Sequence, residues 1–171
     1  VATAMSHDDN LFACASVVAT MAFLRGGEFL WSSRSVRPIL RGKDLFARRE
    51  PGCFSTVVVR IPRPKNAWWE EYLEARCFVF PGLGKFDPRR LLFAYRENAS
   101  VELGPNDPAF RLANGEPLGR DWMVKRTADL LKEAGCHWTD ETGQSTGIKA
   151  SSWRAGGVRS ATIAGIAGPV I

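Results

Sequence analysis

Residues 11–24 read LFACASVVATMAFL and are apolar almost throughout. A helix that is apolar on all sides is normally buried at the centre of a domain. The polar side chains available as N-caps are Ser6, Asp8 and Asp9. We therefore expect a buried central helix, which Gly26 and Gly27 break or bend directly after Arg25.

A run of β-branched residues marks the next element. Residues 54–61 read FSTVVVRI, a composition typical of a β-strand, and Pro62 ends it. Residues 76–80 predict a second short strand, whereas the basic stretch at residues 34–52 is expected to be a loop. Two strands this close in sequence predict a small antiparallel sheet.

The remaining sequence predicts three helices. Asp87 and Pro88 start the first, which runs to about Glu97. The second is the amphipathic stretch DWMVKRTADLLKEAG, ended by its glycine, and the third begins at Ser151 or Ser152. The predicted class is α+β, mainly α, with helices around a small antiparallel sheet.

The composition describes a single globular domain. The chain has 171 residues, of which 45% are hydrophobic, enough apolar surface for a substantial core. Its formal net charge of +5 suits a polyanionic partner. We find no membrane-length apolar run and no basic-then-apolar leader. We therefore expect one domain over residues 1–171, a segment of a longer polypeptide without a secretion or membrane signal.

The cysteines are scattered and include no C-x-x-C pair. They are Cys14, Cys53, Cys77 and Cys136. This spacing indicates neither a zinc site nor a disulfide framework, and it fits reduced thiols in a cytosolic or nuclear protein. We expect no metal, no nucleotide and no other small-molecule cofactor.

Two arginines stand where a helix begins or is interrupted. Arg154 lies in KASSWRAGGVRSATIAGI, residues 149–166, near the start of the last predicted helix. The positive end of a helix dipole repels a guanidinium unless an anion binds there, so this position favours a phosphate or carboxylate ligand. Arg25 occupies a comparable position beside Gly26 and near Glu28. Two such arginines can converge on one phosphate. The alternative, that each pairs with an acidic neighbour and is structural, stays open.

Three segments in this order resemble the catalytic domain of the tyrosine recombinases, the phage-integrase family of DNA breaking and rejoining enzymes. FLRGGEFLW is similar to the family's first arginine box, in which Arg25 would be the first catalytic arginine and Glu28 its supporting acid. VVVRIPRPKN is similar to the sheet segment, whose lysine would be Lys65. SSWRAGGVRSATIAGI is similar to the second box, in which Arg154 would be the second catalytic arginine and Ser151 replaces the usual histidine. The resemblance covers nearly the whole chain and is nearest to recombinases of eukaryotic mobile elements, such as Crypton-type transposons.

The resemblance implies site-specific recombination or integration of double-stranded DNA, with self-association on the DNA and no cofactor. In the family a tyrosine attacks a phosphodiester, forms a phosphotyrosyl link and expels a 5′-hydroxyl. Arg25 and Arg154 would stabilise the charge on the non-bridging oxygens, and Lys65 would give a proton to the leaving oxygen. The implied location is nuclear for a eukaryotic mobile element and cytoplasmic otherwise.

Basic residues outside the catalytic set are candidates for contacts with DNA phosphates. For the stretch at residues 34–49, a solvated charge-rich loop is the alternative. The predicted DNA-binding residues are Arg34, Arg37, Arg41, Lys43, Arg63 and Lys149.

The chain also departs from the family pattern. Ser151 can donate a hydrogen bond to a phosphate oxygen but cannot titrate near neutral pH as a histidine does. Tyr72 and Tyr95 precede the second box and are expected to be packing aromatics, so the nucleophilic tyrosine is expected beyond Ile171. We also expect these residues not to include the family's amino-terminal DNA-clamping domain. We therefore expect these residues alone not to cut DNA.

Two functions stay open at this point. One is a recombinase whose tyrosine lies further along the polypeptide, and the other is a decayed or repurposed domain that binds DNA without breaking it. A tryptophan or histidine followed by a tyrosine, encoded after Ile171, would favour the first. A type IB topoisomerase, which has similar chemistry, and an accidental resemblance both rank lower.

Overall fold

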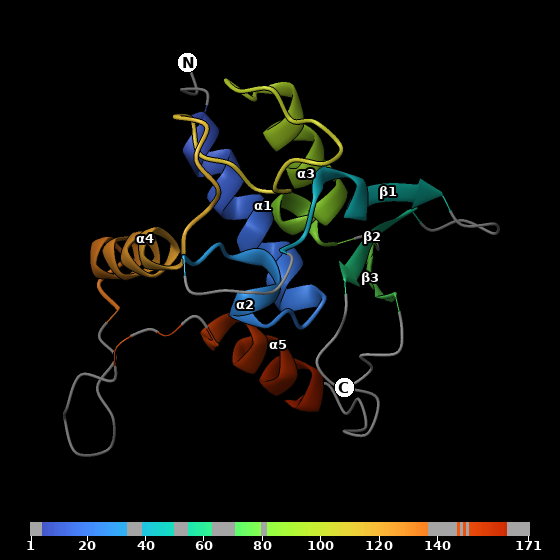
Figure 1. Cartoon of the computed structure of the whole chain (residues 1–171). Helices are drawn as coiled ribbons and strands as arrows, with labels where there is room; N and C mark the ends of the chain where they lie inside the picture. The colour runs from blue at the N-terminus through green and yellow to red at the C-terminus, as the bar shows by residue number, and fades with distance from the viewer. Residues whose placement is uncertain are drawn as a thin grey trace.

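The computed structural model describes residues 5–33, 39–49, 55–62, 71–79, 82–136, 147, 149 and 151–163. Within this part of the chain, five α-helices and one three-stranded antiparallel sheet occur in the order α1, α2, sheet, α3, α4, α5 (Figure 1). The sheet lies at one side of the group of helices. This mixed architecture agrees with the predicted α+β class.

Helix α1, His7–Met21, runs through the centre of the molecule, as its apolar sequence predicts (Figure 1). Ser6 caps the helix by accepting a hydrogen bond from the Asp9 backbone N–H at 3.2 Å. The fully buried residues of the helix are Leu11, Cys14, Ala15, Val18 and Ala19. These side chains pack against α3, α5 and the sheet, so α1 is the element around which the others are arranged.

The end of α1 differs from the prediction. The helix stops at Met21, well before Arg25, and the two glycines begin a new short helix, α2 (Gly26–Phe29), instead of breaking the first. Phe23 has a φ of 52°, and the Leu24 N–H donates back into the last turn of α1 at 2.9 Å, which is the pattern of a Schellman C-cap. Glycine usually occupies the left-handed position of this motif, so a phenylalanine there carries no sequence signal for the helix end.

The sheet consists of β1 (Leu45–Arg49), β2 (Ser55–Pro62) and β3 (Tyr72–Phe78), in the order β1-β2-β3. The strand predicted at residues 54–61 is confirmed as β2, whereas β3 begins earlier than predicted. The prediction of a loop is wrong for β1, all of whose residues pair with β2. Leu45 is the one buried residue of β1, Arg48 lies on the opposite face, and Arg49 is exposed at the end of the strand, so the basic stretch carried little apolar signal.

The three remaining helices confirm the prediction. Helix α3 (Pro88–Glu97) is capped by Asp87, whose carboxylate accepts from the Arg89 backbone N–H at 2.9 Å. Helix α4 (Arg120–Glu133) is followed by Gly135 with a φ of 68°. Helix α5 (Ser152–Ile163) starts at one of the two predicted serines.

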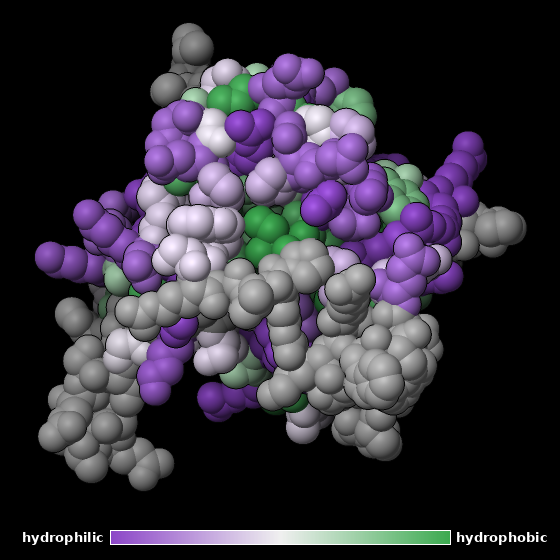
Figure 2. Space-filling model, viewed as in Figure 1, coloured by the Kyte–Doolittle hydropathy of each residue, from purple (hydrophilic) through white to green (hydrophobic). Residues whose placement is uncertain are grey.

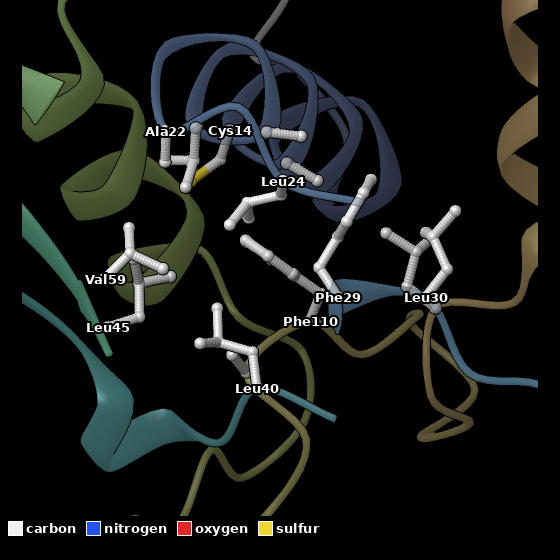
Figure 3. Packing of buried hydrophobic residues seen from close by; sticks show 14 of the residues in the cluster. Cys14, Ala22, Leu24, Phe29, Leu30, Leu40, Leu45, Val59 and Phe110 are labelled. Atoms are coloured by element: carbon white, nitrogen blue, oxygen red, sulfur yellow. The ribbon is translucent and has the colours of Figure 1, made fainter. Parts of the chain in front are cut away.

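The core lies between α1, the inner face of the sheet and the segment around Phe110 (Figure 3). The rings of Phe29 and Phe110 pack edge to face, with centroids 6.3 Å apart, and Leu24 lies beside them. Leu45 and Val59 close the cluster on the side of the sheet. Because Phe29 belongs to α2, this packing fixes the short helix that follows Arg25.

Hydrophilic side chains cover most of the face shown in Figure 2, and apolar residues are visible mainly near its centre. In the part of the chain that the structure describes, the helices are too short or too polar to cross a membrane.

Candidate phosphate-binding site

Arg25 stands directly before α2 and is held there by Glu28. The Glu28 carboxylate accepts a hydrogen bond from the Arg25 backbone N–H at 2.6 Å, which caps the helix. The same carboxylate pairs with Nη1 of the Arg25 guanidinium at 3.3 Å. The Arg25 side chain is 37% exposed. The supporting contact expected for Glu28 is therefore present, and it leaves the other N–H donors of the guanidinium to a ligand.

The start of α5 gathers polar and basic residues. The Ser152 hydroxyl accepts a hydrogen bond from the Lys149 backbone N–H at 3.1 Å and thereby organises the first turn. Lys149 and Ser151 are exposed, whereas Arg154 is half-buried. Within the described residues, the Arg154 guanidinium makes no hydrogen bond or ion pair. Burying a guanidinium is costly unless an anionic group pairs with it.

Helix α5 packs against the connection between α1 and α2 (Figure 1). Trp153 is buried, and its ring meets that of Phe29 edge to face, with centroids 6.3 Å apart. One turn later, Gly157 lies so close to the Thr20 carbonyl that a Cβ at this position would collide with it, and the Phe23 ring is beside it. The two contacts fix α5 at two points along this connection.

This packing places the helix that carries Arg154 against the two elements on either side of Arg25. Trp153, directly before Arg154 in the chain, contacts Phe29 of α2, and Gly157 lies against Thr20 of α1 and Phe23. A third segment adjoins α2, because the Leu40 N–H donates to the Glu28 carbonyl at 2.9 Å, and the exposed Arg41 comes next in the chain. Arg25 and Arg154 thus belong to two segments, distant in sequence, that form one interface.

Other predicted residues are not brought to this interface. Lys43 is exposed in the short 3₁₀ helix η1 (Gly42–Asp44) and lines a concavity of about 490 Å³ together with Arg96. The Arg96 guanidinium already donates to the carbonyls of Gly42, at 3.1 Å, and Leu45, at 2.6 Å. The predictions for Arg34, Arg37, Arg63 and Lys65 lie outside the described residues.

The two tyrosines have different surroundings. Tyr95 is fully buried, and its hydroxyl accepts a hydrogen bond from the Arg111 backbone N–H at 2.9 Å. Burial raises the pKa of Tyr95 to about 12, which makes it a poor nucleophile and confirms the predicted packing role. Tyr72 is 41% exposed on β3, and its ring packs against the Arg60 guanidinium, 5.0 Å from the ring centroid.

The sequence prediction missed two residues that position Arg154, namely Trp153 and Gly157. They lie four positions apart in α5 and therefore on one helix face. The buried residues of α5 are Trp153, Gly157 and Ala161, which repeat at this spacing. That repeat is the signal that would have identified the packed face of the helix.

No group of His, Cys, Asp or Glu side chains in the described segments is arranged to hold a metal ion. No protein-family model matches the chain, and no curated protein matches it significantly. The geometry of the site is therefore the basis for assigning a function.

Proposed function

We propose that this chain forms the arginine-bearing part of a DNA breaking and rejoining domain of the tyrosine recombinase type, and that Arg25 and Arg154 bind the same DNA phosphate. The observation that carries the proposal is the packing of Trp153 and Gly157 against the α1–α2 connection. This packing supports the proposal because it sets the helix that carries the half-buried Arg154 against α2, which Glu28 caps beside Arg25. Double-stranded DNA is the proposed partner.

The chemistry of the reaction explains the two arginines. A tyrosine oxygen would attack the phosphorus, the bond from phosphorus to the 5′-oxygen would break, and the tyrosine would become linked to the 3′-phosphate. Negative charge grows on the non-bridging oxygens in the transition state, where two guanidinium groups can each give parallel N–H donors. Ser151 would add a hydrogen bond to the same phosphate.

The proton and the nucleophile come from elsewhere in this proposal. The leaving 5′-oxygen takes a proton, for which Lys65 is the candidate because an ammonium releases a proton far more readily than a guanidinium. Tyr95 is buried and Tyr72 belongs to the sheet, so the nucleophile would be a tyrosine outside these residues.

A double-mutant cycle tests whether the two arginines share one phosphate. We expect Arg25→Gln and Arg154→Gln each to weaken binding of a labelled DNA duplex about tenfold, the effect of losing a charged hydrogen bond of about 1.5 kcal/mol. The double variant should lose little more than either single variant, with an interaction energy of about 1 kcal/mol. Dissociation constants by fluorescence anisotropy give these values, and unfolding curves verify that each variant is folded.

The control cycle pairs Arg154→Gln with Arg90→Gln. Arg90 lies on α3 with its side chain 75% exposed, so the effects of this pair should add. Additive effects for Arg25 and Arg154 would show that they bind separate groups, and the proposal would fail.

DNA binding without strand cleavage is a second candidate, favoured by Ser151. This exposed hydroxyl stands where a group that titrates near neutral pH is expected. Incubating the parent polypeptide with DNA and then denaturing it separates the candidates. A phosphotyrosyl enzyme leaves a covalent protein–DNA species, whereas a binding domain leaves none while the non-additivity at Arg25 and Arg154 persists.

A further inference from the structure

The sheet presents two unlike faces. Side chains alternate between the faces of a strand, and the inner residues Leu45, Val57 and Val59 are fully buried in the core. The Cys77 thiol also faces inward, with Sγ 4.0 Å from the Val18 carbonyl of α1. The opposite face, here called the outer sheet face, has Thr56 and Val58 of β2 buried at its centre. Its longer side chains are Phe46, Arg48, Arg60, Tyr72, Glu74, Arg76 and Phe78.

Guanidinium groups and aromatic rings alternate across the outer sheet face. The Arg48 guanidinium lies over the Phe46 ring, 5.5 Å from its centroid. The Arg60 guanidinium lies between two rings, 4.9 Å from the Phe46 centroid and 5.0 Å from the Tyr72 centroid. Cation–π contacts of this kind hold flat groups in fixed positions, so the three strands share one row of stacked side chains.

The outer sheet face also carries excess positive charge. The Glu74 carboxylate is 3.2 Å from Nη1 of Arg48, 3.7 Å from Nε of Arg60 and 3.1 Å from Nη2 of Arg76. Among the described residues of this face, one carboxylate therefore faces three guanidinium groups. The three arginine side chains remain 34%, 34% and 43% exposed. Hydrophilic side chains gather over the region of the sheet in Figure 2.

Two aromatic rings are exposed on the same face. Tyr72 is 41% exposed and Phe78 is 55% exposed, at opposite ends of β3. At about 3.3 Å per residue they stand about 20 Å apart, a span that accommodates several nucleotides. In a duplex the base faces are stacked inside, so a flat sheet face reaches them only in an unpaired strand.

We propose that the outer sheet face binds an unpaired nucleic acid strand, with its arginines on the phosphates and the rings of Tyr72 and Phe78 stacked on bases. The charge of the face selects a polyanion, and the exposed rings select unpaired bases over a duplex. This surface lies on the opposite side of the sheet from α1, so the inference does not depend on the Arg25 and Arg154 site.

The test compares a labelled oligothymidine with a duplex of the same length, using fluorescence anisotropy at two salt concentrations. We expect the oligothymidine to bind more tightly. Tyr72→Ala and Phe78→Ala should each weaken its binding about five- to a hundredfold, the range for losing one base–aromatic stack. Tyr72→Phe keeps the ring and should leave binding nearly unchanged.

Charge is tested separately with a matched pair of double variants. Arg48→Gln with Arg76→Gln should weaken oligothymidine binding and flatten its salt dependence. Arg90→Gln with Lys132→Gln makes the same change of charge at exposed positions on α3 and α4 and should have a much smaller effect.

Two results would overturn the inference. If duplex and oligothymidine bind equally and Tyr72→Ala has no effect, the face binds phosphates without stacking bases. If the two double variants weaken oligothymidine binding equally, binding depends on the net charge of the protein and does not occur specifically on the outer sheet face. Unfolding curves for each variant ensure that a loss of binding is measured on folded protein.

Discussion

The interface that carries Arg25 and Arg154 differs from the outer sheet face in how its arginines are held. At the interface, Glu28 pairs with Arg25 alone, and Arg154 is half-buried without a charged partner among the described residues. On the sheet, three arginines share Glu74, and rings stack against two of them. This contrast is the basis of the two proposals, a compact anion at the interface and a longer strand along the sheet.

The largest expected effect concerns the interface. Phe29→Ala removes a ring that packs on both Phe110 and Trp153, so we expect the free energy of unfolding to fall by about 3–5 kcal/mol. Urea unfolding measures the loss. Phe93→Ala removes a ring that is 61% exposed and should cost less than about 0.5 kcal/mol. Similar losses for the two variants would mean that α2 is not anchored in the core.

The second effect is a pH dependence of stability that arises where α1 packs against the inner face of β3, between the two regions. Burial raises the pKa of the Cys14 and Cys77 thiols from 9.0 to about 12. The folded protein therefore keeps protons that the unfolded chain loses, so the free energy of unfolding falls as the pH rises from about 9 to 12. The expected slope is up to about 1.4 kcal/mol per pH unit for each thiol.

Single variants check this pH dependence. Cys14→Ala should reduce the fall of the free energy of unfolding with pH by roughly the contribution of one thiol. Urea unfolding curves measured at a series of pH values above 8 give this slope. Cys136→Ala should leave it unchanged because that thiol is exposed. A slope unaffected by Cys14→Ala would contradict the burial argument.

The third effect is that alanine substitutions at two neighbouring glycines should change the stability in opposite directions. Gly157→Ala would force a Cβ against the Thr20 carbonyl and should destabilise the protein by about 1–3 kcal/mol. Gly156→Ala meets nothing within 4 Å and should stabilise the protein by about 0.4–1 kcal/mol, since alanine favours a helix. Thermal unfolding of both variants gives the signs. Equal changes in stability for the two variants would show that α5 does not approach α1 closely at Gly157.

The smallest effect concerns the stability of the sheet. Arg48→Gln breaks one partly exposed ion pair with Glu74 and should change the free energy of unfolding by about 0.2–1 kcal/mol. Urea unfolding measures it. A much larger loss would mean that the stacked row mainly stabilises the fold, and the contrast between the two regions would weaken.

Local signals in the sequence located most elements but missed one strand and one helix end. Asp87 followed by Pro88 predicted α3, because both residues act within a single turn. The strand β1 was missed because Leu45 is its one buried residue and two of its five residues are arginines, Arg48 on the outer sheet face and Arg49 exposed at the end of the strand. The end of α1 was missed because Phe23 occupies a position that normally takes glycine.

In the candidate site, too, local sequence predicted some features and tertiary packing set the others. The sequence by itself determined Arg25 with Glu28, since three positions along one turn bring a carboxylate to the start of α2. It did not determine which residues meet Arg25 from elsewhere. Only the tertiary structure decided that Trp153 and Gly157 dock α5 on the α1–α2 connection, and that the strand register gathers three arginines around Glu74. Such contacts depend on how distant surfaces fit together, which no short stretch of sequence contains.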